Sequence, residues 1–243
     1  MRMTPARYAA FFCALALLVL CAAFAVSATP IGPTTLQVLG SGSRSMPETS
    51  NSTIGAQGGN VTQVNIDALS ITKSWQGYYG NITGNIHLDN ALNQSFYIWG
   101  NGTLTGEVYA TRNGTVLWSE VNCSNVTQRD SEDAYLGVIA SDGDSAVSTF
   151  NVTTHPTFYV GTQAIGNDTC FSTNLFVNGT KSTDSFYEVL LSDNQSTLIY
   201  TALIEDDSYA YNAQLADFQL MVGENEHIGN IGPTTYYFWI ELS

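Results

Sequence analysis

Residues whose side chains could perform chemistry are few and scattered in this chain of 243 residues. The three histidines, His87, His155 and His227, lie far apart, and none has the HExxH spacing or the cysteine neighbours of a zinc site. The sequence contains no G-x-S-x-G nucleophile turn and no glycine-rich phosphate loop. It therefore favours a protein that is not an enzyme, with a hydrolytic site as the least favoured alternative.

Acidic side chains gather in two short stretches that could supply oxygen ligands to Ca²⁺. The first is centred on Asp142 and Asp144, and the second is 205–207. Neither stretch has the spacing of an EF-hand loop. Because solvated turns are also rich in Asp, we expect no cofactor and keep Asp142 and Asp144 only as weak candidates for a Ca²⁺ site.

The first 28 residues have the pattern of an export signal. Arg2 and Arg7 precede an uninterrupted apolar run from 9 to 26, and small residues follow it. This pattern predicts a signal peptide cleaved after Ala28, and hence an extracellular or cell-surface location. An uncleaved membrane anchor is the alternative, because the run is at the lower limit of the roughly 17–25 residues that span a bilayer. In that case the N-terminal segment would be the contact with the membrane.

The net charge of the chain is strongly negative. It has 21 acidic residues and 7 Lys and Arg, which gives a formal charge of −14. Such a surface repels nucleic acid and anionic lipid, so we expect no nucleic-acid partner. The charge suits a salt-rich exterior, and plain solubility explains it equally well.

Cysteines outside the apolar N-terminal run predict a disulfide. Of the four cysteines, Cys13 and Cys21 belong to that run, which leaves Cys123 and Cys170 as an isolated pair. An isolated pair in an exported chain typically forms a disulfide. Two free thiols or a metal site are the alternative, although the spacing offers a metal no further ligands.

Asparagines occur mostly in the N-glycosylation triplet Asn-x-Ser/Thr. Twelve of the nineteen begin such a triplet, whereas chance would give roughly four at this Ser and Thr content. The excess predicts N-linked glycans on a solvent-facing surface, and turn formation by Asn is the alternative at single sites. The candidate sites are Asn51, Asn60, Asn81, Asn93, Asn101, Asn113, Asn122, Asn125, Asn151, Asn167, Asn178 and Asn194.

Aromatic residues and glycines are concentrated between Trp75 and Gly84. Trp75, Tyr78 and Tyr79 lie among glycines that leave room for exposed rings, and flat rings on a β protein are suited to stacking on sugars. These three side chains are candidate contacts for a carbohydrate or a protein partner. Packing in the core is the alternative.

The same stretch, WQGYYGNITG, carries a resemblance. Together with GNVT at 59–62 and TTYYFWIEL at 234–242, it resembles a group of secreted archaeal proteins of unknown function. The similarity covers about residues 32–243. It implies a cell-surface or extracellular β protein, and it implies no activity and no catalytic residues.

Short alternating segments predict an all-β fold. Residues 29–59 are rich in Thr, Pro, Gly and Ser, which predicts a flexible linker or stalk. The remainder, 60–243, predicts an antiparallel β-sandwich of immunoglobulin-like architecture, as one domain or as two packed sub-domains divided near 123–184. A short helix is expected to begin at Ser131. Strands are expected at 61–66, 82–88, 96–99, 104–111, 115–118, 147–152, 157–160, 185–191, 198–204, 215–222 and 236–242.

Two arrangements follow from these strands. The first four or so predict a consecutive meander, because Asn113 and Gly114 form a strong hairpin signal. The last strand, 236–242, carries aromatic residues on both faces, which is typical of a central strand or an interface.

These features predict an exported, N-glycosylated structural protein of an archaeal cell surface. It would be a subunit of a surface layer or filament, or a coat glycoprotein, and would associate with itself or with other surface glycoproteins. In one version, Thr34–Leu39 adds as a strand to the sheet of a neighbouring copy. A carbohydrate-binding or adhesion module that uses exposed aromatic rings is the alternative.

Overall fold

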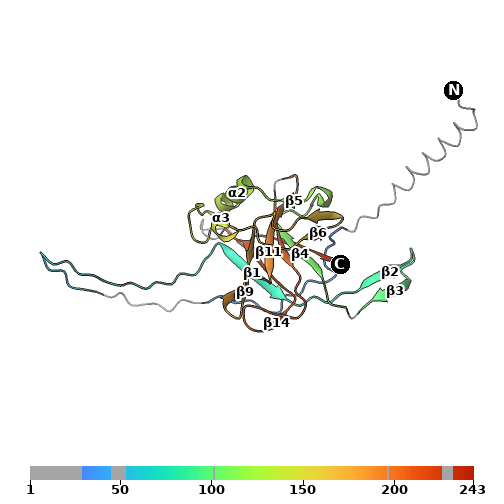
Figure 1. Ribbon diagram of the computed structural model, residues 1–243, viewed down its shortest axis with the longest axis horizontal. Coiled ribbons are helices and arrows are strands. Elements are labelled where there is room, and N and C mark those ends of the chain that lie inside the picture. The colour runs from blue at the N-terminus through green and yellow to red at the C-terminus, as the bar shows by residue number, and fades with distance from the viewer. Residues whose placement is uncertain (1–28, 45–52, 101, 196, 226–231) are drawn as a thin grey trace, which may run out of the picture.

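The computed structural model describes residues 29–44, 53–100, 102–195, 197–225 and 232–243. The expected signal peptide, residues 1–28, and the glycosylation candidates Asn51 and Asn101 lie outside these ranges. The described residues form a β-rich body from which two segments project on opposite sides (Figure 1). One is the extended chain that precedes β1 (Trp75–Gly80), and the other is the hairpin of β2 (Ile86–Asp89) and β3 (Ser95–Trp99).

A six-stranded antiparallel sheet forms the centre of the body, so the expected all-β class is confirmed. Its order is β16-β4-β12-β11-β5, and β8 also pairs with β11. Side chains alternate between the two faces of a strand, and here both faces are covered, which explains the nearly continuous apolar runs. The strands are β4 (Gly106–Thr111), β5 (Asn122–Cys123), β8 (Ser172–Asn174), β11 (Tyr187–Ser192), β12 (Leu198–Leu203) and β16 (Tyr237–Leu242).

The first face of this sheet packs against a second, two-stranded sheet, which gives the expected sandwich-like arrangement. β15 (Phe218–Gly223) pairs with β1 over all six residues of each strand. The core between the two sheets contains Leu190, Tyr200 and Leu220, all fully buried.

The second face is covered by short elements from the middle of the chain. They are η1 (Trp118–Glu120) and the hairpin of β6 (Phe158–Val160) and β7 (Gln163–Ile165). Beneath them, Tyr109, Val189 and Ile199 form a second buried cluster. A third, smaller cluster lies near two further hairpins, β9 (Phe176–Val177) with β10 (Thr180–Lys181), and β13 (Ser208–Tyr209) with β14 (Leu215–Ala216).

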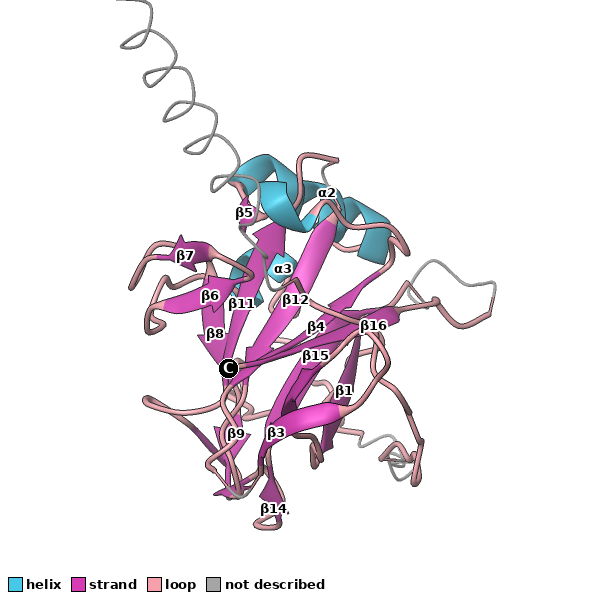
Figure 2. Cartoon of the chain, turned by 90° about the vertical axis from the view of Figure 1, so that its right-hand side faces the viewer, coloured by secondary structure: helices cyan, strands magenta, loops and turns pink. Residues whose placement is uncertain are grey.

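The main helix begins earlier than the sequence predicts. α2 (Val126–Leu136) lies across one end of the central strands (Figure 2), and Asn125 caps it rather than Ser131. The Asn125 side chain accepts a hydrogen bond from the Gln128 amide, and the Gln128 side chain accepts one from the Asn125 amide. This reciprocal capping box satisfies two amides that a helix start leaves unpaired. Ser131 instead bonds back to the Thr127 carbonyl within the helix.

A second helix stands where a strand was expected. α3 (Ala146–Thr149) occupies the first half of the span 147–152, and that prediction is wrong. Ser145 caps the helix, and the Asp133 carboxylate accepts hydrogen bonds from the amides of Ala146 and Val147. A carboxylate at a helix N-terminus is favourable, so a tertiary contact overrides the β-like pattern.

The expected meander is not formed. Residues 61–66 and 115–118 are not in strands, and β4 pairs with β12 and β16, which come from the last quarter of the chain. Of the expected consecutive pairs, the described residues form β2 with β3, whereas β1, which was not predicted, pairs with β15. The reason is burial: β4 lies between two partners that cover its backbone on both sides, which a local hairpin cannot do.

The last strand, β16, lies at the edge of the sheet rather than at its centre. Both of its faces are nevertheless covered, because Phe238 packs against the first cluster and Trp239 against the second. Ile31 forms an antiparallel bridge with Ile240 along the outer edge. Thr34–Leu39 belongs to no strand and is largely exposed.

Candidate functional site

The glycosylation candidates are distributed over the described surface. Of the ten that the structure describes, nine are exposed, and Asn113 is partly buried. Three of them also stabilise turns, but they do so through the carbonyl oxygen Oδ1: Asn113 accepts from the Thr115 amide, Asn122 from the Cys123 amide and Asn125 from the Gln128 amide. An N-linked glycan attaches to the amide nitrogen Nδ2. Turn formation and glycan attachment are therefore compatible in the same residue.

Cys123 and Cys170 form a disulfide, as the sequence predicts. The bond closes a separation of 47 residues and joins β5 to the segment that precedes β8. His155 forms hydrogen bonds with the backbone next to this disulfide. Its Nε2 accepts hydrogen bonds from the amides of Thr169 and Cys170, and its Nδ1 contacts the Pro156 carbonyl at 2.8 Å. Because Nε2 accepts two bonds, the ring proton lies on Nδ1, and this buried histidine has no nitrogen left for a substrate.

The other two histidines lie elsewhere. His87 is exposed on β2, where its Nδ1 is 3.9 Å from the Asp89 carboxylate. His227 is outside the described residues. The structure thus brings His87 and His155 into no common site.

The aromatic–glycine stretch divides between core and surface. Trp75 packs against Phe150, with ring centroids 5.9 Å apart, and its Nε1 donates to the Asp144 carbonyl. Tyr78 packs edge-on against Phe238 at 5.2 Å. Tyr79 is 44% exposed. The three rings therefore do not share one surface on which a sugar could stack.

An exposed ring pair nevertheless exists next to Tyr79. Its ring lies 5.1 Å from that of Tyr211, nearly perpendicular to it, and Asn212 Nδ2 donates to the Tyr79 hydroxyl. Tyr211 is about half exposed. No local pattern points to Tyr211 or Asn212, because they lie more than 130 residues away along the chain.

The two weak Ca²⁺ candidates are engaged in hydrogen bonds within the protein. The Asp142 carboxylate accepts from the Ile139 amide, and the Asp144 carboxylate accepts from the Thr72 hydroxyl at 2.6 Å. Within the described ranges, no three His, Cys, Asp or Glu side chains come together as a metal site would require. Asp144 fixes the chain at its entry to β1.

A buried ion pair joins β4 to α2. The Arg112 guanidinium donates two hydrogen bonds of 2.6 Å to the two carboxylate oxygens of Glu132, which is 2% exposed. The Tyr200 hydroxyl also donates to Glu132, and the Tyr135 ring lies 3.7 Å from the guanidinium carbon. Burial alone would lower the pKa of Arg112, but its hydrogen bonds with Glu132 and the charge of that carboxylate raise it above the ordinary value. Arg112 therefore remains charged.

The ion pair leaves no space around it. A Cβ atom at Gly223 would lie 2.8 Å from a Glu132 carboxylate oxygen and 2.9 Å from the Tyr200 hydroxyl oxygen. This ion pair was not predicted from sequence, although one signal was present. Arg112 follows directly after an apolar strand in a chain with few cations, and a buried cation requires a partner.

A pair of carboxyl groups faces the second cluster from β4 and β16. Glu107 and Glu241 are directly opposite each other in the strand register, and Glu107 is 6% exposed. Burial, followed by the charge of Glu241, raises the pKa of Glu107 to about 8. Glu241 accepts hydrogen bonds from the Gly161 amide and the Tyr109 hydroxyl. Glu107 therefore holds a proton near neutral pH.

Replacing Glu107 by Gln is expected to make the protein less sensitive to pH. The folded-state pKa of Glu107 lies above its ordinary value of 4.5, so its contribution to stability is fully present below pH 4.5 and is lost as the pH rises through about 8. Relative to wild type, Glu107→Gln should gain on the order of 2–3 kcal/mol between these limits, because a neutral amide has no proton to lose. Urea titrations of both proteins at several pH values measure the difference. A constant difference across this range would contradict the assignment.

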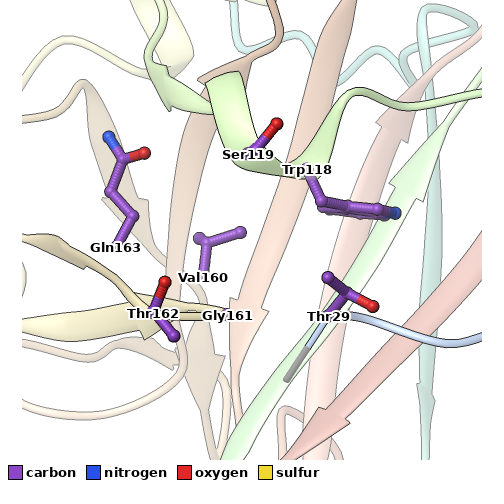
Figure 3. Close-up of a pocket in the computed structure, with 7 residues that line it drawn as sticks. All are labelled: Thr29, Trp118, Ser119, Val160, Gly161, Thr162 and Gln163. Atoms are coloured by element: carbon purple, nitrogen blue, oxygen red, sulfur yellow. The ribbon is translucent and has the colours of Figure 1, made fainter. Parts of the chain in front are cut away.

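A small hollow lies beside this carboxyl pair. Its volume is about 100 Å³, whereas ligand pockets usually hold roughly 300–1,000 Å³. Figure 3 shows residues from η1 and the N-terminal chain on one side and residues of the β6–β7 hairpin on the other. The lining residues are Thr29, Trp118, Ser119, Val160, Gly161, Thr162 and Gln163. The hollow is too small for a sugar ring and its contacts.

Comparisons with known proteins give no match. No family model matches the chain, no curated protein matches its sequence, and no solved structure matches its fold. In the described part of the chain, no helix has the length and apolar character needed to cross a bilayer.

Proposed function

We propose that the chain is an exported, N-glycosylated structural protein of an archaeal cell surface, a subunit of a surface layer or filament or a coat glycoprotein. The observation that carries this proposal is the exposure of the sequon asparagines. Nine of the ten described are exposed. Asn122 and Asn125 use Oδ1 in their turns, whereas Nδ2 of Asn60 and of Asn167 donates to a neighbouring side chain. Glycans at these positions would cover the body and both projections with hydrated chains. The predicted signal peptide supplies the route of export.

The interior supports a structural role in a second way. The Arg112–Glu132 pair is packed between elements and connects the end of β4 to α2. The hollow beside the carboxyl pair is small. These groups stabilise the body and present no reacting geometry to a substrate.

The test uses protein recovered from its native cell surface. We expect glycopeptide mass spectrometry to find glycan on several of the exposed sequons, and negative-stain microscopy to find regular filaments or lattices. The proposed function requires both glycosylation and assembly, and each is tested separately. An intact mass equal to the bare polypeptide would refute the glycoprotein, and dispersed monomers would refute the assembled subunit.

A carbohydrate-binding or adhesion module is the second candidate. The exposed Tyr79–Tyr211 ring pair, with the amide of Asn212 beside it, supports this alternative. An aromatic surface with neighbouring amides is suited to contact a sugar face and its hydroxyl groups. Glycosylated but monomeric protein at the native surface would favour this candidate over the assembled subunit.

A further inference from the structure

The β2–β3 hairpin, residues 86–99, is an apolar arm that projects from the body (Figure 1). Every residue from 83 to 100 is exposed, and Phe96 is 84% exposed. A two-stranded hairpin that stands alone in water is at best marginally stable. The arm therefore lacks a covering element within the described part of this chain.

The side chains of the arm indicate how it is covered. Ile86 is opposite Trp99 and Leu88 is opposite Tyr97, so one face carries four large apolar groups. The tip carries the exposed Leu92 among polar residues, and it contains the glycosylation candidate Asn93. A glycan at the tip opposes insertion into a membrane, whereas the faces and the strand edges remain open to a protein.

The other projection, the extended chain that precedes β1, contains a strand-like segment that pairs with no described strand. Residues 61–71 belong to no strand or bridge, and each of them is exposed. The segment is rich in β-branched residues, which favour pairing in a sheet. Its large apolar side chains are Val61, Val64, Ile66, Leu69 and Ile71. We call residues 61–71 the donor segment.

The arm and the donor segment lie on opposite sides of the body (Figure 1), so they are placed to meet between copies rather than within one chain. Their charges favour a second copy. The donor segment has only Asp67 and the arm only Asp89 as acidic residues, in a chain of net charge −14, so contact here limits like-charge repulsion. Each element also presents at least five large apolar side chains to solvent, which is surface that a protein partner can cover.

We propose that the donor segment of one copy pairs with a free edge of the arm of the next copy and completes a three-stranded sheet. The proposal rests on the proposed function and names the elements that would join its subunits. Because the two surfaces differ, the contact is heterologous and builds open chains rather than closed dimers. The glycosylation candidates Asn60, Asn81 and Asn93 lie at the ends of the two elements or beyond them, where glycans would not block the pairing.

Two variants test the contact in the secreted, glycosylated mature chain. The donor variant, Val64→Pro with Ile66→Pro, removes two amides from a segment that contributes no pairing to the body. The arm variant, Tyr97→Ser with Trp99→Ser, removes aromatic groups from the arm. Val38→Pro, at an exposed position outside both elements, and Tyr159→Ser, at an exposed ring on the body, are the controls.

Light scattering against concentration should find that the wild type and both controls assemble, whereas each variant remains monomeric at concentrations at least about tenfold higher. An equimolar mixture of the two variants should form dimers and stop there, because one retains the arm and the other the donor segment. Donor-variant dimers would indicate a symmetric arm-to-arm contact and overturn the proposal, as would a mixture that stays monomeric.

Two further outcomes separate this proposal from its premise. If the donor variant assembles like the wild type, the proposed pairing fails while the structural role stands. If the wild type is monomeric in solution but floats with neutral phosphatidylcholine vesicles, and the arm variant does not float, the arm binds membrane and the proposal is overturned. Assembly at the native cell surface, measured independently by microscopy, decides the structural role itself.

Discussion

Replacing Arg112 by Met is expected to lower the free energy of unfolding by about 3–5 kcal/mol, because it leaves the buried Glu132 carboxylate without its cation. Among the described residues, the Tyr200 hydroxyl would remain as the side-chain donor to that carboxylate. Desolvation of an unpaired carboxylate is costly, so the group must either take up a proton or draw water between β4 and α2. Guanidinium unfolding followed by circular dichroism measures the loss.

A double-mutant cycle separates the pair from the packing around it. Arg112→Met with Glu132→Leu removes both charges and should recover most of the lost stability, since an apolar pair of similar volume replaces the ion pair. Lys181→Met removes an exposed cation and should leave stability within about 0.5 kcal/mol of wild type. If the double variant were as unstable as the sum of its single variants, the two side chains would not be coupled, and this interpretation would be wrong.

Local pattern was sufficient to identify much of the central sheet. The expected strands at 185–191 and 198–204 correspond to β11 and β12, which form the expected antiparallel hairpin. The segment 236–242 corresponds closely to β16. In these segments, apolar and β-branched residues dominate, and a short turn holds the two strands of the hairpin together. The class and the disulfide followed from the same kind of local information.

Pairing between distant strands could not be predicted in the same way. β4 was expected to turn back at Asn113 and Gly114, yet it lies between β12 and β16. The segment 82–88 was expected to be a strand of the sandwich, yet its side chains Ile86 and Leu88 are exposed to solvent. A pattern of period two states that a strand has an apolar face, but it does not state which surface covers that face.

The candidate sites show the same difference: features that depend on local sequence were predicted, and features that depend on distant contacts were not. Sequon exposure followed from sequence because a glycan acceptor and a turn residue both belong at the surface. The burial of the rings in WQGYYG could not be predicted from sequence, because one strand presents Tyr79 to solvent while Trp75 and Tyr78 pack against the core. The Arg112–Glu132 pair depends on a helix that crosses the sheet, which no periodicity in either element encodes.

Replacing both cysteines of the disulfide by Ala is expected to lower the free energy of unfolding by about 4 kcal/mol in the chain-entropy model, for a separation of 47 residues. The cross-link acts mainly on the unfolded chain. Its loop contains α2, α3 and the β6–β7 hairpin, which would gain conformational freedom on unfolding once the link is absent. Urea unfolding of Cys123→Ala with Cys170→Ala, against wild type in the absence of reductant, measures the change.

The folded state should change much less than the unfolded state, and this distinguishes the disulfide from the buried ion pair. The Cys170 amide still donates to His155 Nε2, and β5 still pairs with β11, so the local structure has other support. The slope of unfolding free energy against urea should therefore increase, because the unlinked chain exposes more surface, whereas the Arg112→Met slope should stay near wild type. An unchanged slope together with a lost near-ultraviolet signal would mean that the disulfide maintains native packing instead.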